Sequence, residues 1–194
     1  PGPLAEPVRR HALHVVADTV GVSIGGGRTA EMTRLRAAPG SWAATADGAT
    51  VLAPGAGRTG PEEAAFLNAT AGSFLELDEG MRPTGHPGMH IVPAALAAAE
   101  VATGGAAVAV ALLLDEDPVA VAAIAATTPT VPVWNACYEG ATARNTAMGI
   151  AAQNALRAVR LHRAGFRGSR ESVGALFGQV TGQVVAAQAL WRLK

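Results

Sequence analysis

Apolar residues recur at steps of three and four along most of this chain, which is the spacing of one face of an α-helix. Val8, Ala12 and Val15 begin the pattern. They predict a first helix from about residue 6 to residue 20, with Gly25-Gly26-Gly27 lying beyond its end.

Further helices follow the same spacing and are bounded by residues that start or stop helices. They are predicted over residues 30–38, from 61, over 93–101, from 117, over 145–163, over 169–177 and over 184–193. Many of their apolar residues are alanine, so that the helix axes can approach closely. Glycine and proline leave room for only a short extended piece at residues 49–53. The predicted fold is one all-α domain over residues 1–194, a compact alanine-rich helical bundle.

Composition excludes several classes of function. Fifteen basic and fifteen acidic residues cancel, and Lys194 is the only lysine, so the chain offers no basic surface for nucleic acid or for an acidic membrane. No apolar run reaches about 18 residues, the length typical of a membrane span. The single cysteine excludes an internal disulfide, and the N-terminus lacks a signal-peptide pattern, so we expect a cytoplasmic protein.

A cluster of ionisable residues interrupts this apolar scaffold in the stretch LELDEGMRPTGHPGMHIVPAALAAAE, residues 75–100. Its acids are Glu76, Asp78 and Glu79, and its histidines are His86 and His90. Proline and glycine at positions 83, 85, 87 and 88 predict a loop, followed by a helix that begins between His90 and Pro93. The free amide groups at the start of that helix would face the loop and could receive an anion.

Three interpretations of the cluster are open on spacing alone. His86 can exchange a proton with a substrate while Asp78 sets its charge. Alternatively, His86 and His90 are four residues apart and can bind zinc together with the carboxylates if the segment is helical, which Pro87-Gly88 opposes. In the third interpretation, the polar residues are solvated side chains of a helix–loop–helix connection.

A second polar segment, YEGATARN, runs from Tyr138 to Asn145. Asn145 can cap the helix predicted over 145–163, which places Arg144 just before the positive end of that helix. Arginine and helix dipole could then hold a carboxylate together. The alternative is that Arg144 forms an ordinary surface ion pair and that residues 138–140 are only a turn.

Four motifs in order carry a resemblance to a known family. They are VADTVGVSIGGG (16–27), EEAAFLNATAGSFLELDEG (62–80), GHPGMHIVPAALAAAE (85–100) and YEGATARNTAMGIAAQNALRAVRLHRAGFRGS (138–169). In this order they resemble the MmgE/PrpD family, which includes 2-methylcitrate dehydratase, cis-aconitate decarboxylase and iminodisuccinate epimerase.

The resemblance implies homodimeric enzymes with a large helical domain and a smaller α/β lid. It implies proton abstraction from small di- and tricarboxylates, followed by elimination or decarboxylation, with no metal or organic cofactor. By position it implies His86 and Asp78 as the catalytic pair and Arg144 as a ligand of the substrate carboxylate. The expected substrate-binding set is completed by Glu76, Glu79, His90 and Tyr138.

This chain also departs from the family pattern. Glu76 and Gly80 stand where decarboxylase-like members have aspartate and threonine, so that decarboxylation is not implied directly. The second histidine motif of the family is missing near residues 103–106, and the lid expected after about residue 182 is not represented. We therefore expect segments of the whole protein to be missing from this sequence at both places. The alternative is a cut-down form of the enzyme, whose site would lack half its walls.

The function expected from these observations is that of a cofactor-independent, dehydratase-type lyase acting on a small di- or tricarboxylate. An isomerase or epimerase, or a decarboxylase, acting on a similar substrate is the alternative within the same chemistry. A catalytically inactive helical dimerisation module is the alternative from another class. No partner other than the small substrate and a second copy of the chain is expected.

Overall fold

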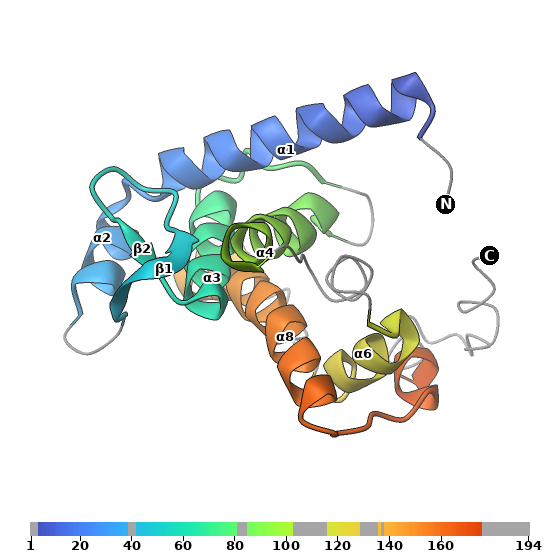
Figure 1. The fold of residues 1–194 in the computed structure, drawn as a ribbon. Helices are drawn as coiled ribbons and strands as arrows, with labels where there is room; N and C mark the ends of the chain where they lie inside the picture. The colour runs from blue at the N-terminus through green and yellow to red at the C-terminus, as the bar shows by residue number, and fades with distance from the viewer. Residues whose placement is uncertain are drawn as a thin grey trace.

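The computed structural model describes residues 4–38, 42–80, 85–102, 116–128, 136 and 138–175. Its elements are α1 (Glu6–Gly26), α2 (Ala30–Ala37), β1 (Ala44–Thr50), β2 (Arg58–Thr59), α3 (Pro61–Ser73), α4 (Pro87–Ala102), α6 (Pro118–Ala125), the 3-10 helix η1 (Thr142–Asn145) and α8 (Thr146–Arg163). Residues 171–175 form a further helical turn. The prediction of a mainly helical chain is confirmed, with one two-stranded sheet added to it (Figure 1). The helix predicted over 184–193 lies outside the described residues.

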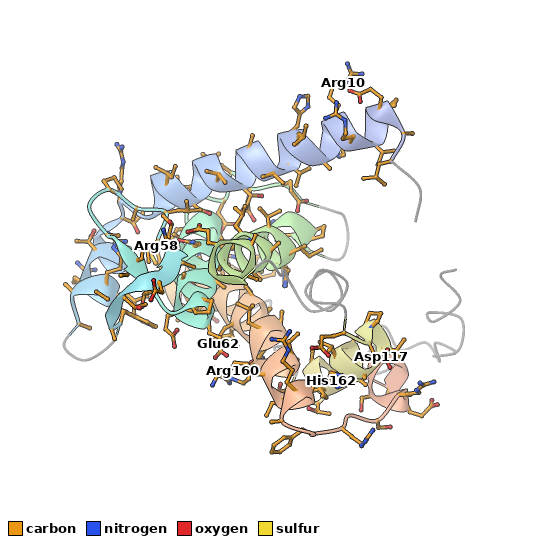
Figure 2. The ribbon with its side chains drawn as sticks, viewed as in Figure 1. Arg10, Arg58, Glu62, Asp117, Arg160 and His162 are labelled. Carbon is orange, nitrogen blue, oxygen red and sulfur yellow. The ribbon has the colours of Figure 1, made fainter. Side chains whose placement is uncertain are left out.

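Helix α3 forms the centre of the packing and contacts α1, α4 and α8 (Figure 1). Its fully buried apolar residues are Ala64, Ala65, Leu67 and Ala69. Since most of these side chains are single methyl groups, three other helices can pack against one short helix. An ion pair reinforces the contact with α8, because Arg160 Nη1 lies 2.6 Å from Oε1 of the buried Glu62 (Figure 2).

The end of α1 shows why the three glycines at 25–27 do not stop the helix where the sequence predicts. The helix continues beyond Val20 and includes Gly25 and Gly26. A Cβ at Gly26 would overlap the carbonyl oxygen of Ala71 and lie 2.7 Å from its carbonyl carbon. Gly26 is therefore required for the close crossing of α1 and α3, not for a helix end.

The start of α4 corrects a second prediction. The helix begins at Pro87, not between His90 and Pro93, and the His90 amide donates to the His86 carbonyl at 3.2 Å. Proline is well tolerated in the first turn of a helix, where its missing amide group has no intrahelical partner to lose. The Pro87-Gly88 pair therefore begins the helix and does not extend the loop.

The hairpin of β1 and β2 is antiparallel, and α3 fixes where its first strand ends. The predicted extended piece at 49–53 overlaps β1 only at its last two residues. Beyond them, the buried Asn68 side chain donates to the Thr50 carbonyl at 2.9 Å and accepts from the Leu52 amide at 2.7 Å. The Asn68 side chain of α3 thus satisfies backbone groups at the end of β1 that a neighbouring strand would otherwise bond.

In the described part of the second half, α6 and α8 follow the predicted boundaries with one exception. The Asp117 side chain accepts from the amide of Val119 at 2.9 Å and begins α6, and Gly165 has the left-handed φ of 88° that ends α8. The exception is Asn145, which does not cap α8 with its side chain. Residues 142–145 form η1 instead, and the Asn145 side chain bonds to α3.

The first half of α1 extends beyond the other described helices (Figure 1). Residues 6–14 are all exposed, including Val8 and Leu13, which are each 54% exposed. None of the described helices has the length and the apolar composition needed to cross a membrane.

Candidate active site

A buried polar contact joins the end of α3 to η1. The Asn145 side chain donates to the Ser73 carbonyl at 2.9 Å, and the Ser73 hydroxyl lies 3.2 Å from the Asn145 carbonyl. Both residues are buried. Burial favours these hydrogen bonds because an unpaired polar group there would be costly. This contact brings the segment after Ser73 beside the segment before Asn145.

Arg144 and Glu76 meet as a result. Arg144 Nη2 and Glu76 Oε1 form an ion pair, in which the Arg144 side chain is 24% exposed and that of Glu76 is 51% exposed. Glu76 has a left-handed φ of 53°, a conformation that glycine favours and that glutamate adopts rarely. Two predicted substrate-binding residues therefore lie together, with the charge of Arg144 already balanced by a carboxylate that water reaches.

His86 makes its two polar contacts through a single ring nitrogen, Nδ1. Its Nδ1 lies 2.9 Å from the carbonyl oxygen of Glu79 and 3.0 Å from Oδ2 of Asp78. The Asp78 side chain is only 2% exposed, and its Oδ2 receives no aligned hydrogen bond from any described residue. Asp78 therefore acts on His86 through its charge, while the hydrogen bond goes to Glu79. The predicted pair of His86 and Asp78 is in contact.

The Glu79 side chain points to the start of α4. Its Oε1 accepts a hydrogen bond from the Gly88 amide in the first turn of that helix. A Cβ at Gly88 would lie 2.6 Å from this oxygen and 3.0 Å from Val15 Cγ1, so the position favours glycine. Because α4 begins earlier than predicted, its first-turn amides lie nearer to the loop than expected, and one of them, that of Gly88, is bound to Glu79 rather than free for a substrate anion.

Burial shifts the pKa of two groups at the site in opposite directions. Burial raises the pKa of the Asp78 carboxyl above 3.8; the charge of His86 opposes this rise, and Glu76 and Glu79 add to it. Burial lowers the pKa of His90 from 6.5, and the charge of His86 lowers it further against the attraction of Glu79. Both shifts favour neutral forms.

The lowered pKa of His90 predicts a loss of stability in mild acid. Below pH 6.5 the His90 side chain binds a proton more readily in the unfolded chain than in the folded protein. Proton binding therefore favours unfolding, and the stability present above pH 6.5 is lost as the pH falls. His90→Gln removes this contribution, and its free energy of unfolding should fall less steeply below about pH 6.5 in urea titrations. His11→Gln, at an exposed position of α1, is the control. Equal pH dependence of His90→Gln and wild type would refute the prediction.

The remaining predicted residues are placed as follows. His90 lies one helical turn after His86. Tyr138 is 84% exposed and forms no hydrogen bond with the other predicted site residues that the structure describes. Among the described residues, no three His, Cys, Asp or Glu side chains lie close enough together to hold a metal ion. The sequence did not reveal the roles of Ser73 and Asn145, since 72 residues separate them and no local pattern connects them.

These features define a mainly helical protein with a histidine–carboxylate contact and an arginine–carboxylate pair, whose two carboxylates, Asp78 and Glu76, are two residues apart in the chain. Together they form a candidate site for acid–base chemistry on an anion. Comparison with protein families matches residues 2–105 to the MmgE/PrpD N-terminal domain. The chain belongs to the MmgE/PrpD family. The matched range contains His86 and the three acids but ends before Arg144 and Tyr138. Comparisons with curated proteins and with solved structures give no match.

Proposed function

We propose that this protein is a dehydratase-type lyase that removes a proton from a small di- or tricarboxylate without an organic cofactor. One observation carries the proposal: the ring of His86, 34% exposed, contacts a buried carboxylate and a main-chain carbonyl through the same nitrogen. An imidazole oriented in this way can accept a proton and return it. Membership of a family that includes dehydratases supports the same class of reaction.

Arg144 is proposed to hold a substrate carboxylate. Its present partner, Glu76, is a half-exposed carboxylate, so a substrate carboxylate can take the same place on the guanidinium or bind beside it. Holding the substrate in this way fixes the carbon next to that carboxylate relative to His86. Glu76 is then an internal competitor for Arg144.

The proposed reaction begins with proton transfer to His86 from a carbon adjacent to a carboxylate. The electron pair of the broken C–H bond forms a C=C bond, and the neighbouring hydroxyl takes up the proton from the His86 imidazolium and leaves as water. The charge of Asp78 stabilises the imidazolium that forms. Delivery of a proton to the opposite face by a second donor, such as water, would give epimerisation. In a decarboxylation the C–CO2 bond breaks instead, and protonated His86 would donate a proton to the carbanion that is left. All three reactions therefore use proton transfer at His86.

The shared step provides the test. The full chain is incubated in deuterated water with a panel of hydroxylated di- and tricarboxylates, and NMR follows both C–H exchange and the appearance of vinylic protons. A dehydratase produces vinylic protons, whereas an epimerase exchanges the C–H proton without elimination. If no acid in the panel shows exchange or product formation, the proposal is refuted.

Arg144→Gln should weaken substrate binding more than it slows turnover. Loss of a charged hydrogen bond of about 1.5–3 kcal/mol predicts a KM raised about 10- to 100-fold, with a smaller change in kcat. Glu76→Gln is the matched control, because it keeps Arg144 and removes the competing carboxylate, so KM should stay equal or fall. An unchanged KM in Arg144→Gln would show that this arginine does not bind the substrate.

The exposed first half of α1 favours a second candidate, a catalytically inactive module that forms a homodimer. Val8 and Leu13 of α1, and Leu4 just before the helix, are each more than half exposed. An inactive module should sediment as a dimer and give no C–H exchange with the whole panel. A homodimer that does exchange the proton fits the enzyme proposal and excludes this candidate.

A further inference from the structure

The contact between Glu79 and His86 fixes where the proton of the imidazole lies. A carbonyl oxygen can only accept a hydrogen bond, so the Nδ1 atom 2.9 Å from the Glu79 carbonyl must carry hydrogen. A neutral imidazole has only one N–H group, which leaves the lone pair on Nε2. Among the described residues, Nε2 has no hydrogen-bond partner. The nitrogen that can accept a proton is therefore Nε2.

Asp78 contributes to this arrangement only through its charge, because an anion close to Nδ1 disfavours a lone pair on that nitrogen. Its Oδ2 is 3.0 Å from Nδ1 but receives no aligned hydrogen bond from the described residues, so it attracts the ring by charge alone. The directional contact comes from the main chain of the next residue, Glu79. The tautomer of His86 thus depends on the charge of Asp78 and on what holds the Glu79 carbonyl in place.

The Glu79 carbonyl is held by the side chain of the same residue. The carboxylate accepts from the Gly88 amide, two residues after His86, so Glu79 contacts the histidine through its main chain and the first turn of α4 through its side chain. A negative charge at this end of a helix is favoured by the helix dipole. These two contacts close a small ring of interactions that includes His86, Pro87 and Gly88.

We propose that Glu79 is the positioning residue of His86: its carbonyl keeps the proton on Nδ1, its carboxylate anchors that carbonyl to α4, and Nε2 is the nitrogen that exchanges a proton with the substrate. The kinetic part of this inference rests on the proposed function, whereas the tautomer does not. The inference also replaces the predicted role of Glu79 as a substrate ligand.

The tautomer can be measured directly. Two-bond ¹H–¹⁵N correlation spectra of the full chain with ¹⁵N-labelled histidine distinguish hydrogen on Nδ1 from hydrogen on Nε2, and His86→Asn identifies the His86 signals. At a pH where the ring is neutral, we expect wild-type His86 to carry its hydrogen on Nδ1. Hydrogen on Nε2 in the folded wild-type protein would overturn the inference, whether or not the protein turns over any acid.

Variants of Glu79 then test the anchor. Glu79→Ala should shift His86 towards a mixture of tautomers and lower kcat in proportion to the fraction that loses the Nδ1 hydrogen, about 2-fold for an equal mixture, with little change in KM. Glu79→Gln keeps a side-chain oxygen that accepts from Gly88 and should retain the wild-type tautomer. Glu31→Ala, which removes an exposed acid from the first turn of α2, is the control and should change neither property.

The outcomes separate the two proposals. A wild-type tautomer in folded Glu79→Ala would show that the carboxylate does not position His86. If Glu79→Ala does not fold, Glu79→Gln tests the anchor in its place: loss of the Nδ1 hydrogen would refute it, and retention would support it. Hydrogen on Nδ1 without turnover of any acid would refute the proposed function and leave the structural inference intact.

Discussion

His86→Asn is expected to lower kcat by about 10²–10⁴-fold on any polycarboxylate that the protein turns over, the usual contribution of a positioned acid–base group. Asparagine is the informative replacement because its amide nitrogen can occupy the place of Nδ1 and donate to the Glu79 carbonyl. The contact that is 2.9 Å long in the native site can therefore persist. Only the group that accepts the substrate proton is lost.

The measurement is steady-state turnover together with C–H exchange in deuterated water, accompanied by thermal unfolding. His14→Gln, on the exposed part of α1, controls for the loss of a histidine elsewhere. We expect both variants to unfold near the wild-type temperature and only His86→Asn to lose exchange. Exchange at the wild-type rate in folded His86→Asn would exclude this histidine as the proton acceptor.

Those parts of the site that lie close together in the sequence could be predicted from it. The contact between Asp78 and His86 joins residues eight apart in a segment marked by proline and glycine. The sequence predicts Arg144 at the start of a helix but does not predict that Glu76 is its ion-pair partner. The two residues meet only because Ser73 and Asn145 form a buried contact. Such contacts depend on how distant segments of the chain pack together, and the periodicity of apolar residues does not show this.

The helix boundaries show the same limit. Pro61 and Asp117-Pro118 marked helix starts correctly, because a cap or a first-turn proline acts within one turn. The predicted helix boundaries at Gly26 and Pro87 are wrong, because glycine and proline each have two structural roles. Glycine can end a helix or permit close packing, and proline can break a helix or begin one. The neighbour across the interface, such as Ala71 for Gly26, decides between them.

Gly26→Ala is expected to be the most destabilising single-methyl change in α1. The added Cβ would overlap the Ala71 carbonyl oxygen, which belongs to the backbone of α3 and cannot rotate away. Separating the two helices should cost about 3 kcal/mol, the upper end for overpacking, and lower Tm by roughly 6–12 °C. Thermal and urea unfolding of the full chain measure the change.

Gly21→Ala provides the matched control within the same helix. Nothing lies within 4 Å of the Cβ that it would add, so alanine should only improve helix propensity, raising stability by about 0.5–1 kcal/mol. The two substitutions add the same methyl group five residues apart. Changes of opposite sign in the free energy of unfolding would show that the α1–α3 contact causes the difference. Since α3 ends at the contact that brings Glu76 to Arg144, a Gly26→Ala protein that remains folded should also bind substrate more weakly. If Gly26→Ala were as stable as Gly21→Ala, the close crossing of α1 and α3 would be wrong, and the position of the candidate site on α3 would lose its support.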